Sequence, residues 1–259
     1  MMTLSRSFLA GIILFLYLPV FVMVAMAFNE SSLYTLPFDP TLRWFEALAS
    51  NNKLLAASRN SLTIAVATSV IATAIGTMAS MALARRRFRG RALLQILLLP
   101  PISIPWLITG TAMLVFFFWT GIGRGIHAMM IGHVALAIPY VVLIVGAGMQ
   151  SVRTDLEEAA MSLGSTPLHA FWSVTLPLLA PSIVAAALFA FAVSLDQFVV
   201  SYFLSTPGVS TLPVEIYSSI RQGFTPEINA ISTIFLGAST LLIFLFTQLS
   251  SFGGERGRR

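Results

Sequence analysis

The sequence predicts an all-α, polytopic membrane protein: one domain over residues 1–259 with about six transmembrane helices. Three observations lead to this fold class. The 259-residue chain is 57% hydrophobic and only 10% charged, whereas a soluble domain carries about 25% charged residues. The apolar residues form long runs, and each run can cross a hydrocarbon core of about 30 Å as a helix. The basic residues gather in the links between the runs.

Each apolar run is a predicted span. The first run begins after Arg6 and is long enough to cross a membrane. No clear small-x-small cleavage site follows it, which indicates a retained helix and not a signal peptide. Between residues 205 and 229, several prolines predict a broken helix or a reentrant segment, because proline removes a backbone donor. The six runs cover approximately residues 8–28, 61–84, 92–118, 130–150, 181–203 and 230–250.

Small residues inside the runs indicate where helices approach each other closely. Glycine, alanine and serine allow two membrane helices to pack with their backbones near contact. The residues in question are Gly76 with Ala72 and Ser80, and also Gly110, Gly146 and Gly148.

The distribution of basic residues predicts the orientation, because cytoplasmic loops carry an excess of Lys and Arg. If there are six spans, ten basic residues fall on one side and five on the other. Both termini are therefore expected in the cytoplasm. The arginine run at 85–91 could also be a nucleic-acid or lipid-headgroup patch. Its place between two spans favours a topology anchor, so no nucleic-acid partner is expected. The ten are Arg6, Arg85, Arg86, Arg87, Arg89, Arg91, Arg153, Arg256, Arg258 and Arg259.

The composition excludes several kinds of chemistry. The chain has no cysteine, and its three histidines show no metal-ligand spacing. A P-loop needs a Gly-Lys-Ser/Thr sequence, but the only lysine is Lys53, in a link between spans. The glycine-rich run 121–125 also lies between spans and indicates a turn. We therefore expect no cofactor, no metal site and no catalytic residues.

A polar segment separates the fourth and fifth runs. Residues 154–163 favour a helix, and Gly164 permits a turn that a side chain would obstruct. The segment contains Glu158-Ala159-Ala160, then Gly164 after three residues, and Leu176-Pro177 further on. This spacing resembles the EAA loop of ABC importer permeases, with Val174 in place of the isoleucine of that motif.

This resemblance implies a type I ABC importer permease fold in a bacterial inner membrane. It implies that residues 153–177 form a cytoplasmic coupling loop that docks on a dimer of partner ATPases, with Glu158 as the charged contact. The permease itself would not hydrolyse ATP. Its other partners would be a second permease subunit, giving a heterodimer, a periplasmic solute-binding protein and membrane lipid. Transport would follow alternating access.

Asp196 is the one acid inside an apolar run, where a charge is costly and usually faces a cavity or a transport path. Ser194 and Asp196 could both border an irregular turn of the helix. An anionic site suggests a cationic or polyhydroxylated substrate, and a structural or gating role is the alternative.

The segments 194–203, 211–218 and 225–230 are similar to those of spermidine/putrescine permeases, and the similarity extends over nearly the whole chain. It implies transport of a polyamine. The residues it implies for the substrate path are Ser194, Asp196, Gln197, Tyr202, Trp106 and Glu215.

Two departures from that family keep other substrates open. Gln197 stands where polyamine permeases often have a second acid, and Trp106 stands where they tend to have an acid after the proline. Another amine, an opine-like compound or an iron chelate is the alternative within the class. A stand-alone secondary transporter or channel is the alternative outside it. A secondary carrier usually has more spans, inverted repeats and coupling-ion residues.

Overall fold

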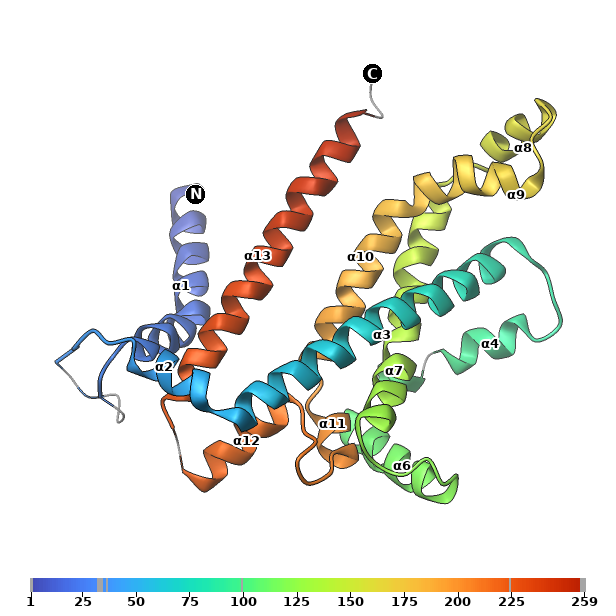
Figure 1. Ribbon diagram of the computed structural model, residues 1–259. Helices are drawn as coiled ribbons and strands as arrows, with labels where there is room; N and C mark the ends of the chain where they lie inside the picture. The colour runs from blue at the N-terminus through green and yellow to red at the C-terminus, as the bar shows by residue number, and fades with distance from the viewer. Residues whose placement is uncertain (1, 32–34, 36, 99, 224, 257–259) are drawn as a thin grey trace. The chain divides into compact units, whose positions relative to one another are not determined.

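The computed structural model describes residues 2–31, 35, 37–98, 100–223 and 225–256, and the regular structure in these ranges is helical (Figure 1). The described chain forms two compact units, residues 1–55 with 216–259 and residues 56–215. The helices are α1 Met2–Ala27, α2 Arg43–Ser50, α3 Asn52–Arg85, α4 Arg91–Leu97, α5 Pro100–Ser103, α6 Trp106–Trp119, α7 Ile126–Ser151, α8 Thr154–Ser162, α9 Pro167–Ala170, the π-helical turn η1 Phe171–Thr175, α10 Leu176–Leu195, α11 Val199–Leu204, α12 Leu212–Gln222 and α13 Glu227–Arg256.

The first unit pairs the two terminal helices. α1 packs against α13, and α2 packs against the start of α13. The Asn51 amide, at the end of α2, donates to Glu227 Oε2 at 2.7 Å. After α1, buried Asn29 accepts from the Asp39 amide at 2.9 Å, and its carbonyl accepts from the Trp44 indole at 2.8 Å. These bonds close the link between α1 and α2.

The second unit is built around α7. α10 lies along α7, and Figure 1 shows the two helices side by side. Their buried side chains, together with Ala72 of α3, form one core cluster: Ala137, Val141, Val145, Ala186 and Ala190. α3 is also tied to α10 by the Ser69 hydroxyl, which donates to the Ala187 carbonyl at 2.7 Å.

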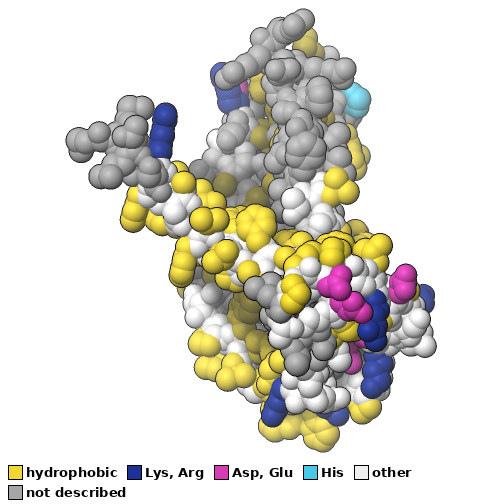
Figure 2. All heavy atoms as spheres, turned by 90° about the vertical axis from the view of Figure 1, so that its left-hand side faces the viewer, with side chains coloured by type: hydrophobic (Ala, Val, Ile, Leu, Met, Phe, Trp, Pro, Cys, Tyr) yellow, Lys and Arg dark blue, Asp and Glu magenta, His cyan; other side chains and the backbone are white. Residues whose placement is uncertain are grey.

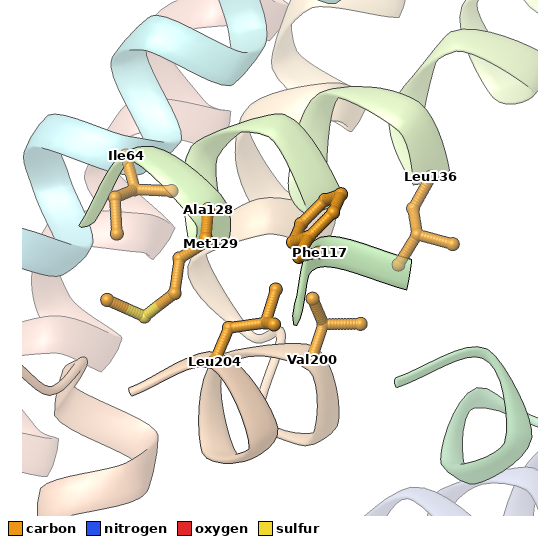
Figure 3. Packing of buried hydrophobic residues seen from close by; sticks show 7 residues of the cluster. All are labelled: Ile64, Phe117, Ala128, Met129, Leu136, Val200 and Leu204. Carbon is orange, nitrogen blue, oxygen red and sulfur yellow. The ribbon is translucent and has the colours of Figure 1, made fainter. Parts of the chain in front are cut away.

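A second cluster joins α3, α6, α7 and α11 (Figure 3). Met129 of α7 and Phe117 of α6 meet Val200 and Leu204 of the short helix α11, and Ile64 of α3 closes the group. All of these side chains are buried. This cluster therefore holds the segment after residue 195 against the rest of the unit.

Apolar side chains cover much of the outer surface, which fits a lipid environment. In Figure 2 apolar side chains are spread over the visible face, while most of the visible acidic side chains gather in one area, with basic side chains there and at several other places. The apolar window of α1 contributes no buried side chain. A surface of this kind is stable in hydrocarbon and not in water.

The predicted spans correspond to helices, with differences at their ends. Among the described residues, four helices are long and apolar enough to cross a membrane. They are Phe8–Ala27, Asn52–Arg85, Ile126–Gln150 and Pro167–Leu195. A fifth is reached if the bent pair Arg91–Ser103 and Trp106–Trp119 counts as one span. The sixth predicted run lies within α13, and a total of six stays a prediction.

Two predicted runs are not continuous helices. The run at 92–118 bends by 113° between α5 and α6, because Pro105 cannot donate a backbone hydrogen bond. The run at 181–203 breaks between α10 and α11 at residues 196–198. Between 205 and 229, as expected, the helix is interrupted on both sides of α12.

Three of the predicted packing glycines lie where two helices leave no room for a side chain. A Cβ atom at Gly76 of α3 would lie 2.6 Å from Val141 Cγ1 of α7. One at Gly110 of α6 would lie 2.9 Å from the Phe203 ring of α11, and one at Gly148 of α7 would overlap Ser182 of α10. The nearest atom to a Cβ at Gly146 is Ser80 Oγ at 3.4 Å, an ordinary contact.

We expect Gly76→Ala to lower the stability of the protein, because the new methyl group would overlap the fixed Cβ and Cγ1 of Val141. Overpacking of this kind costs about 1–3 kcal/mol. The control is Gly11→Ala in α1, where no atom lies within 4 Å of the new Cβ. Thermal unfolding in detergent should show a lower Tm for Gly76→Ala alone, and equal Tm values for both variants would contradict the close packing.

Candidate functional site

The segment predicted as a coupling loop forms two short helices and a π-helical turn. α8 covers most of the predicted helix at 154–163, and Figure 1 shows α8 and α9 beyond the ends of α7 and α10. Asp155 and Glu157 lie in the first turn of α8, where negative charge suits the helix dipole. The Arg153 guanidinium pairs with Asp155, and this hydrogen bond holds the pKa of Asp155 below its usual value.

Gly164 ends α8 in a Schellman motif. Its φ of 95° lies in the left-handed region. A Cβ atom at this position would meet no atom within 4 Å, so glycine is favoured here by the backbone angle and not by a lack of room for a side chain. The Gly164 amide donates to the Met161 carbonyl at 3.0 Å, and the Ser165 amide donates to the Ala160 carbonyl at 3.1 Å. This glycine sets the direction in which the chain leaves α8.

The chain then returns to the membrane without a gap in helical structure. Thr166 caps α9 by accepting from the His169 amide at 3.3 Å, and Pro167 occupies the first turn. η1 follows α9 directly and continues into α10, whose first residues are Leu176 and Pro177. A displacement of α9 therefore passes along one unbroken backbone into α10.

The outer surface of this loop carries both charge and exposed apolar side chains. Glu158 and Ala159 are exposed, and Ala160 is half-buried. Leu163 is 89% exposed, Leu168 68% and Trp172 59%. Large apolar groups in a polar connecting segment are typical of a surface that another protein covers.

Glu157, next to Glu158, has a partner within the chain. Nη1 of Arg85, the last residue of α3, donates to its two carboxylate oxygens at 2.6 and 2.5 Å. Adjacent residues of a helix do not point to the same side. The two neighbouring acids of α8 therefore face different surroundings.

Four of the six predicted substrate-path residues, Ser194, Asp196, Gln197 and Tyr202, lie at the break between α10 and α11, but they differ in exposure. Asp196 follows the last residue of α10 and is exposed. Ser194 and Gln197, by contrast, are buried. Tyr202 is 44% exposed and stacks near Phe198 with ring centroids 5.5 Å apart.

His133 of α7 spans this break from inside the protein. Its Nδ1 lies 2.8 Å from the Ser194 hydroxyl of α10, and its Nε2 lies 2.9 Å from the Ser201 hydroxyl of α11. All three side chains are buried. Because each hydroxyl can donate or accept, either tautomer of a neutral imidazole satisfies both contacts. The histidine thus links the helices on the two sides of the break.

Gln197 lies inside the break itself. Its side chain is 1% exposed, and neither its amide nitrogen nor its amide oxygen has a hydrogen-bond partner among the described residues. An unpaired buried polar group costs about 1–3 kcal/mol. Gln197 is therefore a buried polar side chain whose hydrogen bonds the described residues do not supply.

Trp106 is the first residue of α6, a helix that packs on α11, whereas Glu215 lies on α12. Gly110 of α6 packs on Val199 and Phe203, and the Gly125 amide beyond α6 donates to the Leu204 carbonyl at 2.8 Å. These contacts hold α6 against α11. Trp106 is 37% exposed. On α12, Glu215 instead accepts from the Ser210 hydroxyl at 3.0 Å.

Two features were missed by the sequence analysis. His133 had a signal, since a histidine within an apolar span usually has a polar partner, but its serine partners are 61 and 68 residues away. The pairing of Arg85 with Glu157 joins residues 72 apart and has no sequence signature.

The sequence has clear relatives. Residues 72–252 match the family described as the binding-protein-dependent transport system inner membrane component. The chain is 36% identical over 239 residues to the putrescine transport system permease protein PotI of Escherichia coli strain K12, covering 89% of this chain and 85% of the relative. It is 32% identical to the spermidine/putrescine transport system permease protein PotC of the same strain, covering 93% and 91%.

Solved structures share the fold at lower identity. A bacterial ABC transporter that imports the acidic polysaccharide alginate superposes with a TM-score of 0.69 at 16% identity, covering 96% of this chain and 95% of that one. The methionine ABC transporter MetNI in an inward-facing form superposes with a TM-score of 0.63 at 19% identity, covering 77% and 95%. The predicted fold class, that of ABC importer permeases, is confirmed.

We expect His133→Leu to destabilise the protein, because it leaves the buried Ser194 and Ser201 hydroxyls without the imidazole. Hydrogen bonds between side chains within membrane proteins contribute about 0.6 kcal/mol each on average, so the loss should be roughly 1 kcal/mol. His169→Leu, in exposed α9, is the control. Thermal unfolding should show a lower Tm for His133→Leu only, and the same Tm for both variants would exclude a stabilising link.

Proposed function

Because this chain belongs to the family of inner membrane components of binding-protein-dependent transport systems, we propose that it is the permease subunit of an ATP-driven importer of polyamines. The family is that of a membrane permease, which is not itself an enzyme. Hydrolysis of ATP is assigned to a dimer of partner subunits in the cytoplasm. A second permease subunit and a periplasmic solute-binding protein complete the transporter.

The observation that carries this proposal is the exposed surface of α8 and α9. Glu158 offers a charge for a basic residue or backbone amides of an ATPase, and Leu163, Leu168 and Trp172 offer apolar contact area around it. The rest of the predicted motif supports this surface: Ala159 and Ala160 lie on the same helix, Gly164 fixes its end, and Leu176 and Pro177 begin the helix that returns to the membrane.

The same loop supports the proposed orientation. If α8 faces the cytoplasm, the arginines at the end of α3 face it too, because Arg85 touches Glu157. With the six predicted spans, both termini would lie in the cytoplasm as well, in agreement with the excess of basic residues. The proposed location is a bacterial inner membrane.

The break between α10 and α11 supports a cationic substrate. Asp196 is exposed, and it supplies the negative charge that an ammonium group needs. Aromatic faces bind ammonium groups through cation–π interaction, and the exposed rings of Tyr202 and Trp106 are available for it. The unpaired amide of Gln197 offers a neutral partner. Ser194 is assigned to the link with His133, and Glu215 is proposed only as a more distant acid.

Transport would follow from differences in how well partners bind two states of the permease. A ligand shifts a conformational equilibrium only by its difference in affinity for the two states. ATP-bound ATPases would draw the coupling loops of the two permeases together and favour the outward-open path, and hydrolysis would reset it. In this chain, the direct connection from α9 through η1 to α10 would carry the movement to Asp196.

The decisive experiment is uptake of labelled putrescine and spermidine into vesicles that hold this permease with its genomic partners. Saturable uptake that needs both ATP and the binding protein would support the polyamine importer. If there is no polyamine uptake but the loaded binding protein still stimulates ATP hydrolysis, the importer assignment holds and the substrate is another solute. Uptake that persists without the ATPase would instead point to a stand-alone secondary transporter or channel.

We expect Asp196→Asn to raise the apparent KM for polyamine uptake by about tenfold, because a charged hydrogen-bond partner contributes roughly 1.5–3 kcal/mol. Asp39→Asn removes the same charge from the exposed link after α1 and should leave uptake unchanged. Uptake kinetics in vesicles measure the difference. An unchanged KM and rate in Asp196→Asn would show that this carboxylate does not contact the substrate.

We expect Glu158→Lys to release the ATPase subunits, because it places a positive charge where the proposed partner offers a basic residue or amides. Retention of the ATPase by the affinity-purified permease should fall about tenfold, the effect of losing roughly 1.4 kcal/mol of binding free energy. The Tm of the permease should not change, since Glu158 is exposed. Normal retention together with normal uptake would remove this residue from the docking surface.

A further inference from the structure

We propose that the ion pair between Arg85 and Glu157 is a strut that makes α8 move together with α3, so that docking of the loop drives a second helix besides α10. The proposal rests on the proposed function, in which α8 is the element that the ATPase moves. It adds a route of transmission and gives Arg85 and Glu157 the role of positioning residues.

The contact has the geometry of a firm link. Nη1 of Arg85 donates to both carboxylate oxygens of Glu157, at 2.6 and 2.5 Å. The two side chains are only 25% and 15% exposed. The other ion pair among the described residues, Arg153 with Asp155, is 76% and 53% exposed and joins neighbours in sequence. Arg85 and Glu157 are therefore the less exposed of the two pairs, and the one that crosses between elements.

The same guanidinium also reaches the far side of the loop. Its Nη2 lies 3.5 Å from the hydroxyl of Thr175, which is buried in η1 just before α10. One arginine at the end of α3 thus touches the loop both where it begins and where it returns to the membrane. A planar guanidinium presents several donors in fixed directions, and this lets it contact two groups at once.

The ion pair gives α8 a connection outside its own loop. The elements that pack most closely on α8 are α9 and η1, which belong to the same loop. A force on α8 would reach α10 through them, along the backbone. Because Arg85 is the last residue of α3, the ion pair carries the same force to a helix of 34 residues, which contributes Ile64 and Ala72 to the two core clusters described above.

The two adjacent acids of α8 then have separate tasks. Glu158 faces outward and is exposed, whereas Glu157 is held against Arg85. Loss of Glu158 should remove the ATPase from the permease. Loss of Glu157 should leave the ATPase bound but loosen the connection between the docked helix and α3. An isolated ion pair near a surface contributes little to stability, so the expected effect is on coupling and not on folding.

The test uses the complete transporter in vesicles and measures labelled polyamine taken up per ATP hydrolysed. Arg85→Gln and Glu157→Gln should each lower this ratio about fivefold, the lower end of coupling between linked protein sites, while the ATPase subunits still co-purify. Arg85→Lys keeps the charge and should recover part of the ratio. The exchanged pair, Arg85→Glu with Glu157→Arg, should recover at least half of it.

Arg86→Gln is the matched control. Arg86 has the same charge, lies one residue further along, is exposed, and makes no ion pair with another described residue. The Arg86→Gln transporter should take up as much polyamine per ATP hydrolysed as the wild type. Single variants with a normal ratio, or an exchanged pair no better than the single variants in an assembled complex, would overturn the strut.

A second measurement covers the case in which the exchanged pair does not assemble. The chain has no cysteine, so Arg85→Cys with Glu157→Cys introduces two unique thiols into this subunit. This variant should couple poorly, and a thiol cross-linker about as long as an arginine side chain should restore coupling. Cross-linking that leaves the ratio low would contradict the strut.

Failure of the proposed function would give a different result. A wild-type complex that retains no ATPase subunits, and whose uptake does not need ATP, would overturn the importer and the strut with it. Stimulation of ATP hydrolysis by the binding protein, purified with its native solute, reports the same coupling. The coupling of the variants can therefore still be compared, through stimulated ATP hydrolysis, if the solute is not a polyamine.

Discussion

A backbone that crosses hydrocarbon has no water to bond with, so every amide and carbonyl must find a partner within the protein. This constraint accounts for the helical fold and decides where the helices can stop. At residues 196–198 the chain leaves helical geometry yet keeps its bonds. The Asp196 amide donates to the Ala192 carbonyl at 3.1 Å, and the Tyr202 amide donates to the Phe198 carbonyl at 2.8 Å. Around the break, the cluster of Val200 and Leu204 and the contacts of His133 provide protein in place of lipid. The polar groups exposed at this position are therefore tolerated because the neighbouring helices enclose the rest.

Close packing makes that enclosure possible. Gly76 brings α3 close to α7, Gly110 brings α6 close to α11, and Gly148 brings α7 close to α10. Neighbouring helices therefore contact α7 on more than one side. Close-packed helix contacts of this kind transmit strain. The loop is attached to this unit at two places, through the continuous backbone of η1 and α10 and through the side chain of Arg85. A unit that is dense inside and held at two points is suited to respond to a displaced loop by a concerted shift.

Local features of the fold were predictable because they depend on neighbouring residues. The apolar runs predicted the long helices. Gly164 predicted the turn at the end of α8, since a left-handed backbone angle favours glycine. The glycines that allow close contact were recognisable, but their partners Val141, Phe203 and Ser182 were not. The break at Asp196 was foreseen only as an irregular turn, because its length depends on how α11 packs. The partners of His133 and Arg85 could not be predicted from the sequence, because they are set by the tertiary arrangement and not by spacing. Within the candidate path, pattern alone could not separate exposed Asp196 from buried Ser194 and Gln197.

The apolar surface of the loop has a consequence for how such a subunit is made. Leu163, Leu168 and Trp172 stand in an aqueous segment with most of their area uncovered. Until a partner subunit covers them, they are exposed apolar surface of the kind that promotes aggregation. Chaperones and proteases act on such surface in cells. If the proposed ATPase covers these side chains, a newly synthesised copy that has not bound it would be removed through the same side chains. Surplus copies would then be cleared, and the balance among subunits would be enforced after translation.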